Sequence, residues 1–222
     1  MNKTIYITLN KSSAQMELEE ICSLLMSSNN VCTIALIGYL NGLWLTSNGM
    51  NQVWNDLYNM VKHAGKRIHF FIDQQTANEM RKDDRTALLM NHQNVVIHIV
   101  GDWKKWSLGE LGMKFDAIIA NPPYCAGLHL KILQDLMPLS DNIVCIHPAS
   151  WLQFPTRQRP AFMNGRIGDF QIIDRKEANE MFDIDGGDIV ISTFVKDGAS
   201  FQGSPVTDPQ FCCFKFNSRF DF

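Results

Sequence analysis

The sequence of 222 residues predicts an α/β protein built on a doubly wound, mostly parallel sheet. Short apolar runs recur along the chain, and stretches of helical composition separate most of them. This alternation implies crossover connections, which place helices on both faces of a parallel sheet. With 45% hydrophobic and 19% charged residues the chain can bury one core, so we expect a single domain over residues 1–222.

The first elements follow from hydrophobic spacing. Residues 14–28 carry apolar side chains at helical intervals, which predicts an N-terminal helical extension over residues 1–30. The apolar, partly β-branched run 31–37 leads into a glycine-containing turn and is typical of a buried strand. Residues 52–63 place apolar side chains on one helical face and end shortly before a glycine, so we expect a helix there.

The remaining elements continue the alternation. Five more apolar runs are expected to be strands, and two further stretches have helical composition. The expected strands are residues 67–72, 94–100, 115–120, 142–147 and 188–195, and the expected helices are residues 76–90 and 128–137. The stretch 153–168 is rich in Arg and Pro and is expected to be an irregular loop.

Polar or glycine residues follow four of the expected strands. Gly38, Asp73, Asp102 and Asn121 each come at, or soon after, the end of an apolar run. In open parallel sheets ligands bind at the carboxyl ends of the strands. The sequence therefore predicts a binding site built from these four strand ends.

The tetrapeptide Asn121-Pro122-Pro123-Tyr124 is the most informative motif. Two consecutive prolines fix two φ angles and remove two backbone donors, so they form a stiff turn at the end of the strand. An Asn before this turn and an aromatic residue after it place a polar contact and a stacking contact side by side. Such a pair suits a flat amide or an amino-bearing base.

In its setting FDAIIANPPY, this tetrapeptide resembles motif IV of amino-directed S-adenosylmethionine methyltransferases. Residues 143–152 are similar to the strand and turn after motif IV in restriction-modification adenine methylases, and the resemblance covers roughly residues 67–196. It implies a Rossmann-like methyltransferase fold and methyl transfer from S-adenosylmethionine to the exocyclic N6 amine of adenine in DNA, with RNA as the lesser alternative.

The resemblance also implies roles for the site residues. The Asn121 side-chain oxygen and the Pro122 carbonyl would accept from the amine, Pro123 would stiffen the turn, and Tyr124 would stack on the extruded base. Four residues would bind the cofactor. They are Gly38 near the methionine moiety, Asp73 at the ribose hydroxyls, Asp102 at the adenine amine and Trp103 against the adenine ring.

Each cofactor residue also has an ordinary structural explanation. Asp73 could cap the following helix, Asp102 could close a tight turn after a glycine, and Gly38 with Gly42 could form an ordinary turn. The chain also lacks the acid and closely spaced glycines that family members carry after the first strand. Two other functions therefore stay open: a degenerate methyltransferase fold that binds nucleic acid or protein without catalysis, and glutamine-amide methylation of a protein.

Charge and composition limit the partners. A net charge of −3 gives no global attraction to nucleic acid, so DNA or RNA would need a local basic lip or a partner subunit that supplies specificity. The candidate residues for this lip are Arg157, Arg159, Arg166, Arg175 and Lys176.

The six cysteines and six histidines show no metal-ligand spacing, although His147 could line the pocket. Without a membrane-spanning run or signal peptide, the protein is expected to be cytoplasmic.

Overall fold

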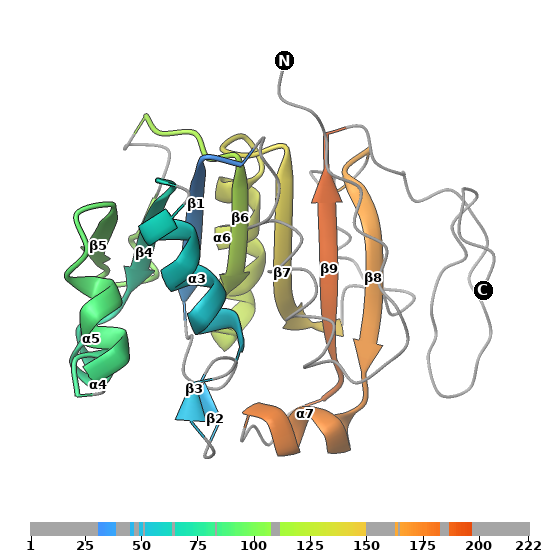
Figure 1. The fold of residues 1–222 in the computed structure, drawn as a ribbon. Coiled ribbons are helices and arrows are strands. Elements are labelled where there is room, and N and C mark those ends of the chain that lie inside the picture. Colours follow the sequence, from blue (N-terminus) through green and yellow to red (C-terminus); the bar gives the residue numbers. More distant parts are fainter. Residues whose placement is uncertain are drawn as a thin grey trace, which may run out of the picture.

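The apolar runs form one seven-stranded sheet with helices on both faces (Figure 1). The structure is a computed structural model of the chain. This structure describes residues 31–38, 45–46, 49–50, 52–63, 65–82, 84–107, 112–149, 163, 165–182 and 187–196. The N-terminal extension expected over residues 1–30, and most of the loop expected at 153–168, lie outside these residues.

The strand order is β5-β4-β1-β6-β7-β9-β8. The strands are β1 (Thr33–Gly38), β4 (Arg67–Ile72), β5 (Val95–Ile99), β6 (Ala117–Asn121), β7 (Asn142–Pro148), β8 (Ile167–Ile173) and β9 (Ile189–Val195). The first five in the order pair in parallel, whereas β9 is antiparallel to both of its neighbours. The prediction of a mostly parallel sheet is therefore confirmed.

Two apolar layers hold the helices against the sheet. On one face, α3 (Gln52–His63), α4 (Gln74–Met80), α5 (Asp84–Met90) and α7 (Arg175–Phe182) contribute buried side chains to one cluster. On the other face, α6 (Leu128–Leu136) packs together with Trp103 and Trp106 of the segment that follows β5. Figure 1 shows α3 in front of the sheet and α6 behind it. Each large side chain fully buried in these layers contributes about 1.5–3 kcal/mol.

The sequence was wrong about some elements. The helix expected over residues 76–90 is two helices, α4 and α5, separated where the charged residues Arg81 and Lys82 are exposed. The Thr86 hydroxyl donates to the Met80 carbonyl across this break. Three further features were not predicted: β8, whose start falls in the stretch expected to be irregular, α7, and a short antiparallel hairpin of β2 (Leu45–Thr46) and β3 (Gly49–Met50).

The chain reverses its direction across the sheet between β1 and β6. After β1 it adds β4 and β5 on one side, and it then returns to β6 on the other side of β1 and continues to β7. Such a topological switch point is where ligands bind in open α/β sheets, outside the carboxyl ends of the strands. Here Gly38 of β1 pairs with Asn121 of β6 at those ends. The fold therefore places the central motif at the position that most favours a ligand.

None of the helices in the described ranges is both long and apolar enough to cross a membrane.

Candidate functional site

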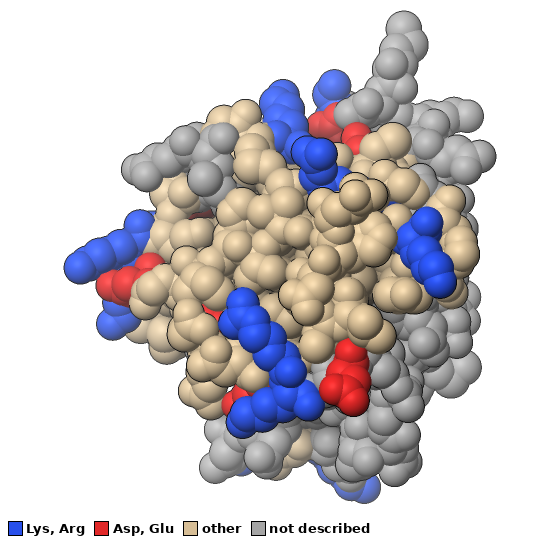
Figure 2. Space-filling view, turned by 60° about the vertical axis from the view of Figure 1, so that its left-hand side comes forward, with Lys and Arg blue, Asp and Glu red and all other residues tan. Residues whose placement is uncertain are grey.

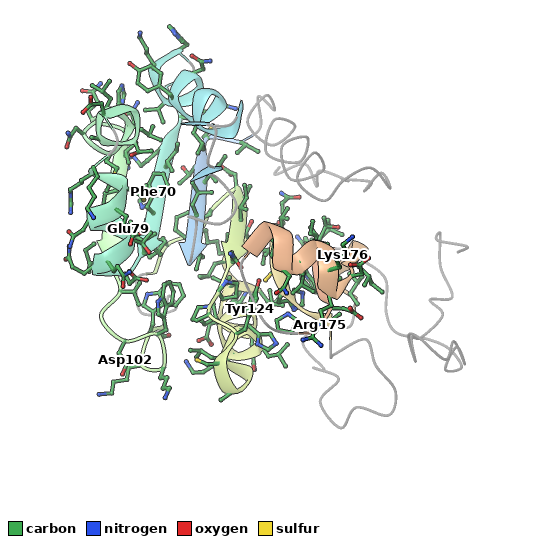
Figure 3. The ribbon with its side chains drawn as sticks, turned by 90° about the horizontal axis from the view of Figure 1, so that it is seen from below. Phe70, Glu79, Asp102, Tyr124, Arg175 and Lys176 are labelled. Atoms are coloured by element: carbon green, nitrogen blue, oxygen red, sulfur yellow. The ribbon has the colours of Figure 1, made fainter. Side chains whose placement is uncertain are left out.

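The four strand ends predicted to form a site lie at one edge of the sheet. Their strands are neighbours in the order β5-β4-β1-β6, so Asp102, Asp73, Gly38 and Asn121 follow one another along that edge. Figure 3 looks onto this edge, with Asp102 to one side of Tyr124 and Arg175 and Lys176 to the other. The predicted placement is confirmed, and the chemical roles of these residues stay predictions.

Gly38 is required by contact between two strand ends. Its φ is +94°, a conformation that side chains rarely adopt. A Cβ atom at this position would lie 2.0 Å from the Asn121 carbonyl oxygen, far inside van der Waals contact. The absence of a side chain thus lets the backbone of β1 pass directly against the Asn-Pro-Pro corner. This glycine has a structural purpose that an ordinary turn would not explain.

Asn121 is the last residue of β6, and only 7% of it is exposed. The Tyr124 hydroxyl donates to the Asn121 Oδ1 atom over 2.7 Å. Burial raises the pKa of the Tyr124 phenol, with a smaller contribution from Cys145, so the hydroxyl keeps its proton and remains a donor. The side-chain oxygen of Asn121, and not its amide nitrogen, therefore faces the tyrosine.

A strained turn connects this corner to α6. Ala126 has a φ of +49° and Gly127 a φ of +77°, and α6 begins at Leu128. A left-handed conformation is uncommon for alanine and is maintained only when the surrounding structure enforces it. The corner is therefore held between β6 on one side and α6 on the other.

Buried histidines lie behind the corner. The His129 ring of α6 meets the Tyr124 ring edge-on, with 6.1 Å between centroids, and the His147 ring of β7 lies 6.1 Å from that of His129. The His147 Nε2 atom is 3.0 Å from the Ser192 hydroxyl, and burial lowers the pKa of His147 to about 3. His147 is fully buried and neutral, so it supports the corner from inside and does not form part of an open pocket wall.

The positions of His129 and Ser192 behind the corner were not predicted from the sequence. A histidine one residue into an apolar helix, directly after the motif, was the only available signal for His129. Ser192 sits in an apolar strand far along the chain, and only the pairing of β7 with β9 brings it to His147.

The two acids at the neighbouring strand ends make local bonds. Asp73 is the N-cap of α4, and its Oδ1 atom accepts from the Thr76 backbone N–H over 2.7 Å. Asp102 accepts from the Lys104 backbone N–H over 2.9 Å, and its other oxygen lies 3.9 Å from the exposed Lys105 ammonium group. The structural explanations of both acids are thus present in the fold. A carboxylate has several acceptor positions, so neither bond prevents a second partner.

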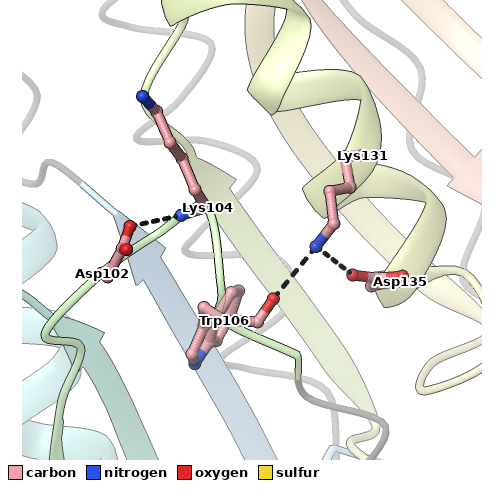
Figure 4. Close-up of polar contacts among 5 residues, drawn as sticks. All are labelled: Asp102, Lys104, Trp106, Lys131 and Asp135. Carbon is pink, nitrogen blue, oxygen red and sulfur yellow. Dashed lines mark hydrogen bonds and ion pairs between the residues drawn. The ribbon is translucent and has the colours of Figure 1, made fainter.

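Trp103 lies in the apolar layer beside α6 and is 8% exposed. Its ring meets that of Trp106 edge-on, with centroids 5.0 Å apart. The Lys131 ammonium group of α6 donates to the Trp106 carbonyl over 3.3 Å and pairs with Asp135 over 3.4 Å (Figure 4). A hydrogen bond therefore connects the segment after β5 to α6, the helix that follows the Asn-Pro-Pro-Tyr motif.

The expected basic lip is only partly present. Arg166 donates to the carbonyl oxygens of Met137 and Ser140, beyond the end of α6, and these residues precede β7 at the opposite edge of the sheet. The prediction that Arg166 belongs to the basic lip was wrong, because its side chain lies at the edge of the sheet opposite to Tyr124. The sequence does not reveal at which edge an arginine lies. Arg175 and Lys176 are exposed at the start of α7, on the same edge as Tyr124 (Figure 3). Arg157 and Arg159 lie outside the described residues.

No protein-family model matches the chain, and no curated protein matches it. Among solved structures, it is similar to a type I restriction-modification system methyltransferase subunit from Streptococcus thermophilus, with a TM-score of 0.56 and 11% identity over 84% of this chain and 44% of that one. The chain has a Rossmann-like methyltransferase fold. It is also similar to a tRNA (uracil-54, C5)-methyltransferase from Pyrococcus abyssi in complex with S-adenosyl-L-homocysteine, with a TM-score of 0.45 and 18% identity over 82% of this chain and 38% of that one. The chain spans less than half the length of either structure.

Proposed function

We propose that the protein transfers a methyl group from S-adenosylmethionine to the exocyclic N6 amine of adenine in DNA, with RNA as the lesser alternative. One observation carries the proposal: a buried Asn carboxamide, oriented by a tyrosine hydroxyl, ends the strand at the topological switch point. The fold shared with a methyltransferase subunit supports methyl transfer as the reaction.

The edge of the sheet offers groups that fit the cofactor. Asp73 uses one carboxylate oxygen for its helix cap, and its other oxygen suits the ribose hydroxyls. Asp102 lies at the next strand end, where an acceptor suits the amine of the cofactor's adenine. Beside it, the Trp103 Nε1–H is buried and has no acceptor among the described residues, so it is a donor that a ligand could satisfy. When bound, the cofactor supplies an electrophilic methyl group.

The corner itself supplies what the acceptor amine needs. The nitrogen of such an amine is a poor nucleophile because its lone pair is delocalised into the ring. Two acceptors, the Asn121 Oδ1 atom and the Pro122 carbonyl, would favour its pyramidal form as positive charge develops. A carboxamide oxygen has two lone pairs, so accepting from the Tyr124 hydroxyl does not by itself prevent the Asn121 oxygen from accepting from the amine. The methylated nitrogen would carry a positive charge and would then release one proton to water, so no strong base is needed. The neutral, fully buried His147 has no part in this proton transfer.

Tyr124 would hold the base in place. It is half-buried beside Asn121, and base stacking on an aromatic ring contributes about 1–3 kcal/mol. Arg175 and Lys176, exposed on the same edge, would contact the phosphate backbone. A partner subunit is the proposed source of sequence recognition, because the net charge of −3 gives this chain no global attraction to nucleic acid.

One observation favours a second function, nucleic-acid binding without catalysis. The approach of Asn121 accounts for Gly38 without any cofactor, and the residues after Gly38 lack the acid and glycine spacing of the family. A calorimetric titration with S-adenosylmethionine separates the two functions. Saturable binding supports the enzyme, and no heat at millimolar cofactor supports the binding module.

The reaction is tested by incubating the protein with isotopically labelled S-adenosylmethionine and unmodified DNA, followed by mass analysis of the nucleosides. Labelled N6-methyldeoxyadenosine is expected. A parallel incubation with RNA shows whether DNA or RNA is the substrate. In a third incubation with a protein substrate, label found only in that protein would favour glutamine-amide methylation over the proposed reaction. Saturable cofactor binding without label in any acceptor would contradict the proposed reaction.

A further inference from the structure

The two edge strands of the sheet differ in their protection. Exposed edges invite pairing with another chain, and proteins commonly prevent it with charged residues, proline or β-bulges. At one edge, β8 contains Asp169 and a register irregularity between Ile167 and Asp169. At the other edge, β5 pairs regularly with β4 over its whole length and contains neither a charge nor a proline.

The outward hydrogen-bonding groups of β5 follow from its pairing with β4. Asn94 accepts from the Ile68 N–H, and the Val100 N–H donates to Ile72, so the even-numbered residues direct their peptide groups toward β4. Peptide groups alternate along a strand. The peptide groups of Ile97 and Ile99 therefore point away from the sheet, and β4 is the only strand paired with β5 in the described part of the chain.

The segment that contains this edge is uncharged and exposes two large apolar side chains. The sequence from Ala87 to Gly101 contains no Lys, Arg, Asp or Glu. Leu88 of α5 is 62% exposed and Ile99 is 45% exposed. Figure 2, turned to bring the β5 side forward, shows a broad uncharged surface with the Lys and Arg side chains mostly around it.

We infer that β5 is the edge through which two copies of this chain pair, antiparallel, into one continuous sheet. A twofold axis beside Ile97 brings Ile97 opposite its own counterpart, where the two residues exchange N–H···O bonds, and sets Ile99 opposite Val95. A twofold interface brings the same surface of both copies together, so a charge close to the axis would face a like charge. The absence of charge from Ala87 to Gly101 makes this surface compatible with itself.

This geometry leaves the proposed active site open. Asn121 lies on β6, with β1 and β4 between it and the pairing strand, and antiparallel pairing directs the carboxyl edges of the two sheets in opposite directions. The inference does not depend on the proposed methyl transfer, and its failure would leave that proposal unchanged.

The test is the mass of the protein in solution, measured by sedimentation and light scattering at about 50 µM, a concentration that detects micromolar dissociation constants. Wild type is expected at twice the 25.3 kDa of the chain. Ile99→Lys adds a charge to the pairing edge, and Ile99→Pro removes an outward N–H at an edge position where proline is tolerated. Each should raise the dissociation constant at least about tenfold, a loss of about 1.4 kcal/mol.

The matched control is Gln134→Lys, which adds the same charge at an exposed position of α6 and should keep the dimer mass. Circular dichroism confirms that each variant is folded. A monomeric wild type would overturn the inference. A dissociation constant unchanged by both Ile99 substitutions would also overturn it, since another surface would then hold the copies together.

Discussion

The corner where β1 meets β6 and the neighbouring ends of β4 and β5 share one edge of the sheet, yet they are built differently. At the corner, the Asn121 backbone leaves no space for a side chain at position 38, and the Asn121 side chain is buried and hydrogen-bonded to Tyr124. At the ends of β4 and β5, Asp73 and Asp102 are more exposed and are bound by their own backbone segments. The difference separates a position fixed by long-range packing from positions fixed by local turns.

This contrast indicates how the parts of the site can be tested. A change at the corner acts on contacts between two strands, so it should affect the stability of the whole fold or the binding of the proposed acceptor amine. A change at Asp73 or Asp102 acts on a helix cap or a turn, and its effect on a ligand can be separated from its effect on stability.

The largest effect is expected from Gly38→Ala. The new Cβ would collide with the Asn121 carbonyl and adopt an unfavourable φ, so the free energy of unfolding should fall by about 3–5 kcal/mol. Chemical denaturation measures this change. Gly65→Ala is the control, because Gly65 also has a positive φ, +64°, but nothing lies within 4 Å of its added Cβ; it should cost about 1–2 kcal/mol. Equal losses would show that the corner is not tightly packed.

Substitutions of Tyr124 separate its ring from its hydroxyl. Tyr124→Phe removes the hydrogen bond that orients Asn121 and should lower kcat/KM by about 3- to 10-fold. Tyr124→Ala also removes the stacking surface and should lower it by about 100-fold. Methyl incorporation at limiting substrate measures both losses, and equal losses would exclude a stacking role for the ring.

Two substitutions of Asp73 separate the helix cap from the ligand. Asp73→Ala should cost about 1 kcal/mol of stability, because α4 loses its N-cap, whereas Asp73→Ser retains a capping oxygen and should unfold like wild type. Both should weaken cofactor binding by about 10-fold if the carboxylate holds the ribose, since a hydrogen bond to a charged group contributes about 1.5–3 kcal/mol. Calorimetry with Asp73→Ser decides the matter, and unchanged affinity would leave this aspartate with its capping role alone.

The sequence predicted most of the sheet because its strands are continuous apolar runs with turn residues between them. It also placed Asn121 and Asp73 correctly at strand ends. It did not predict β8, where Gly168, Asp169 and Gln171 interrupt the apolar pattern, or the break between α4 and α5.

The parts of the site that it could not predict depend on distant contacts. The bond from Tyr124 to Asn121, the pairing of Gly38 with Asn121 and the contact between His147 and Ser192 all arise from the folding of separated segments onto each other. Arg166 shows the same limit, since its position in the sequence does not reveal that it reaches the carbonyls beyond α6.

The central claim is that the Asn121 carboxamide holds the acceptor amine, and single-turnover methyl transfer to DNA by Asn121→Ala tests it directly. The rate should fall by at least about 100-fold, which is the typical loss when one preorganised hydrogen-bonding group is removed from a catalytic site. The affinity for S-adenosylmethionine should stay within about threefold of wild type, a difference below 1 kcal/mol. Asn78→Ala, on the exposed surface of α4, should match wild type in both measurements. Methyl transfer at the wild-type rate by Asn121→Ala would contradict the account.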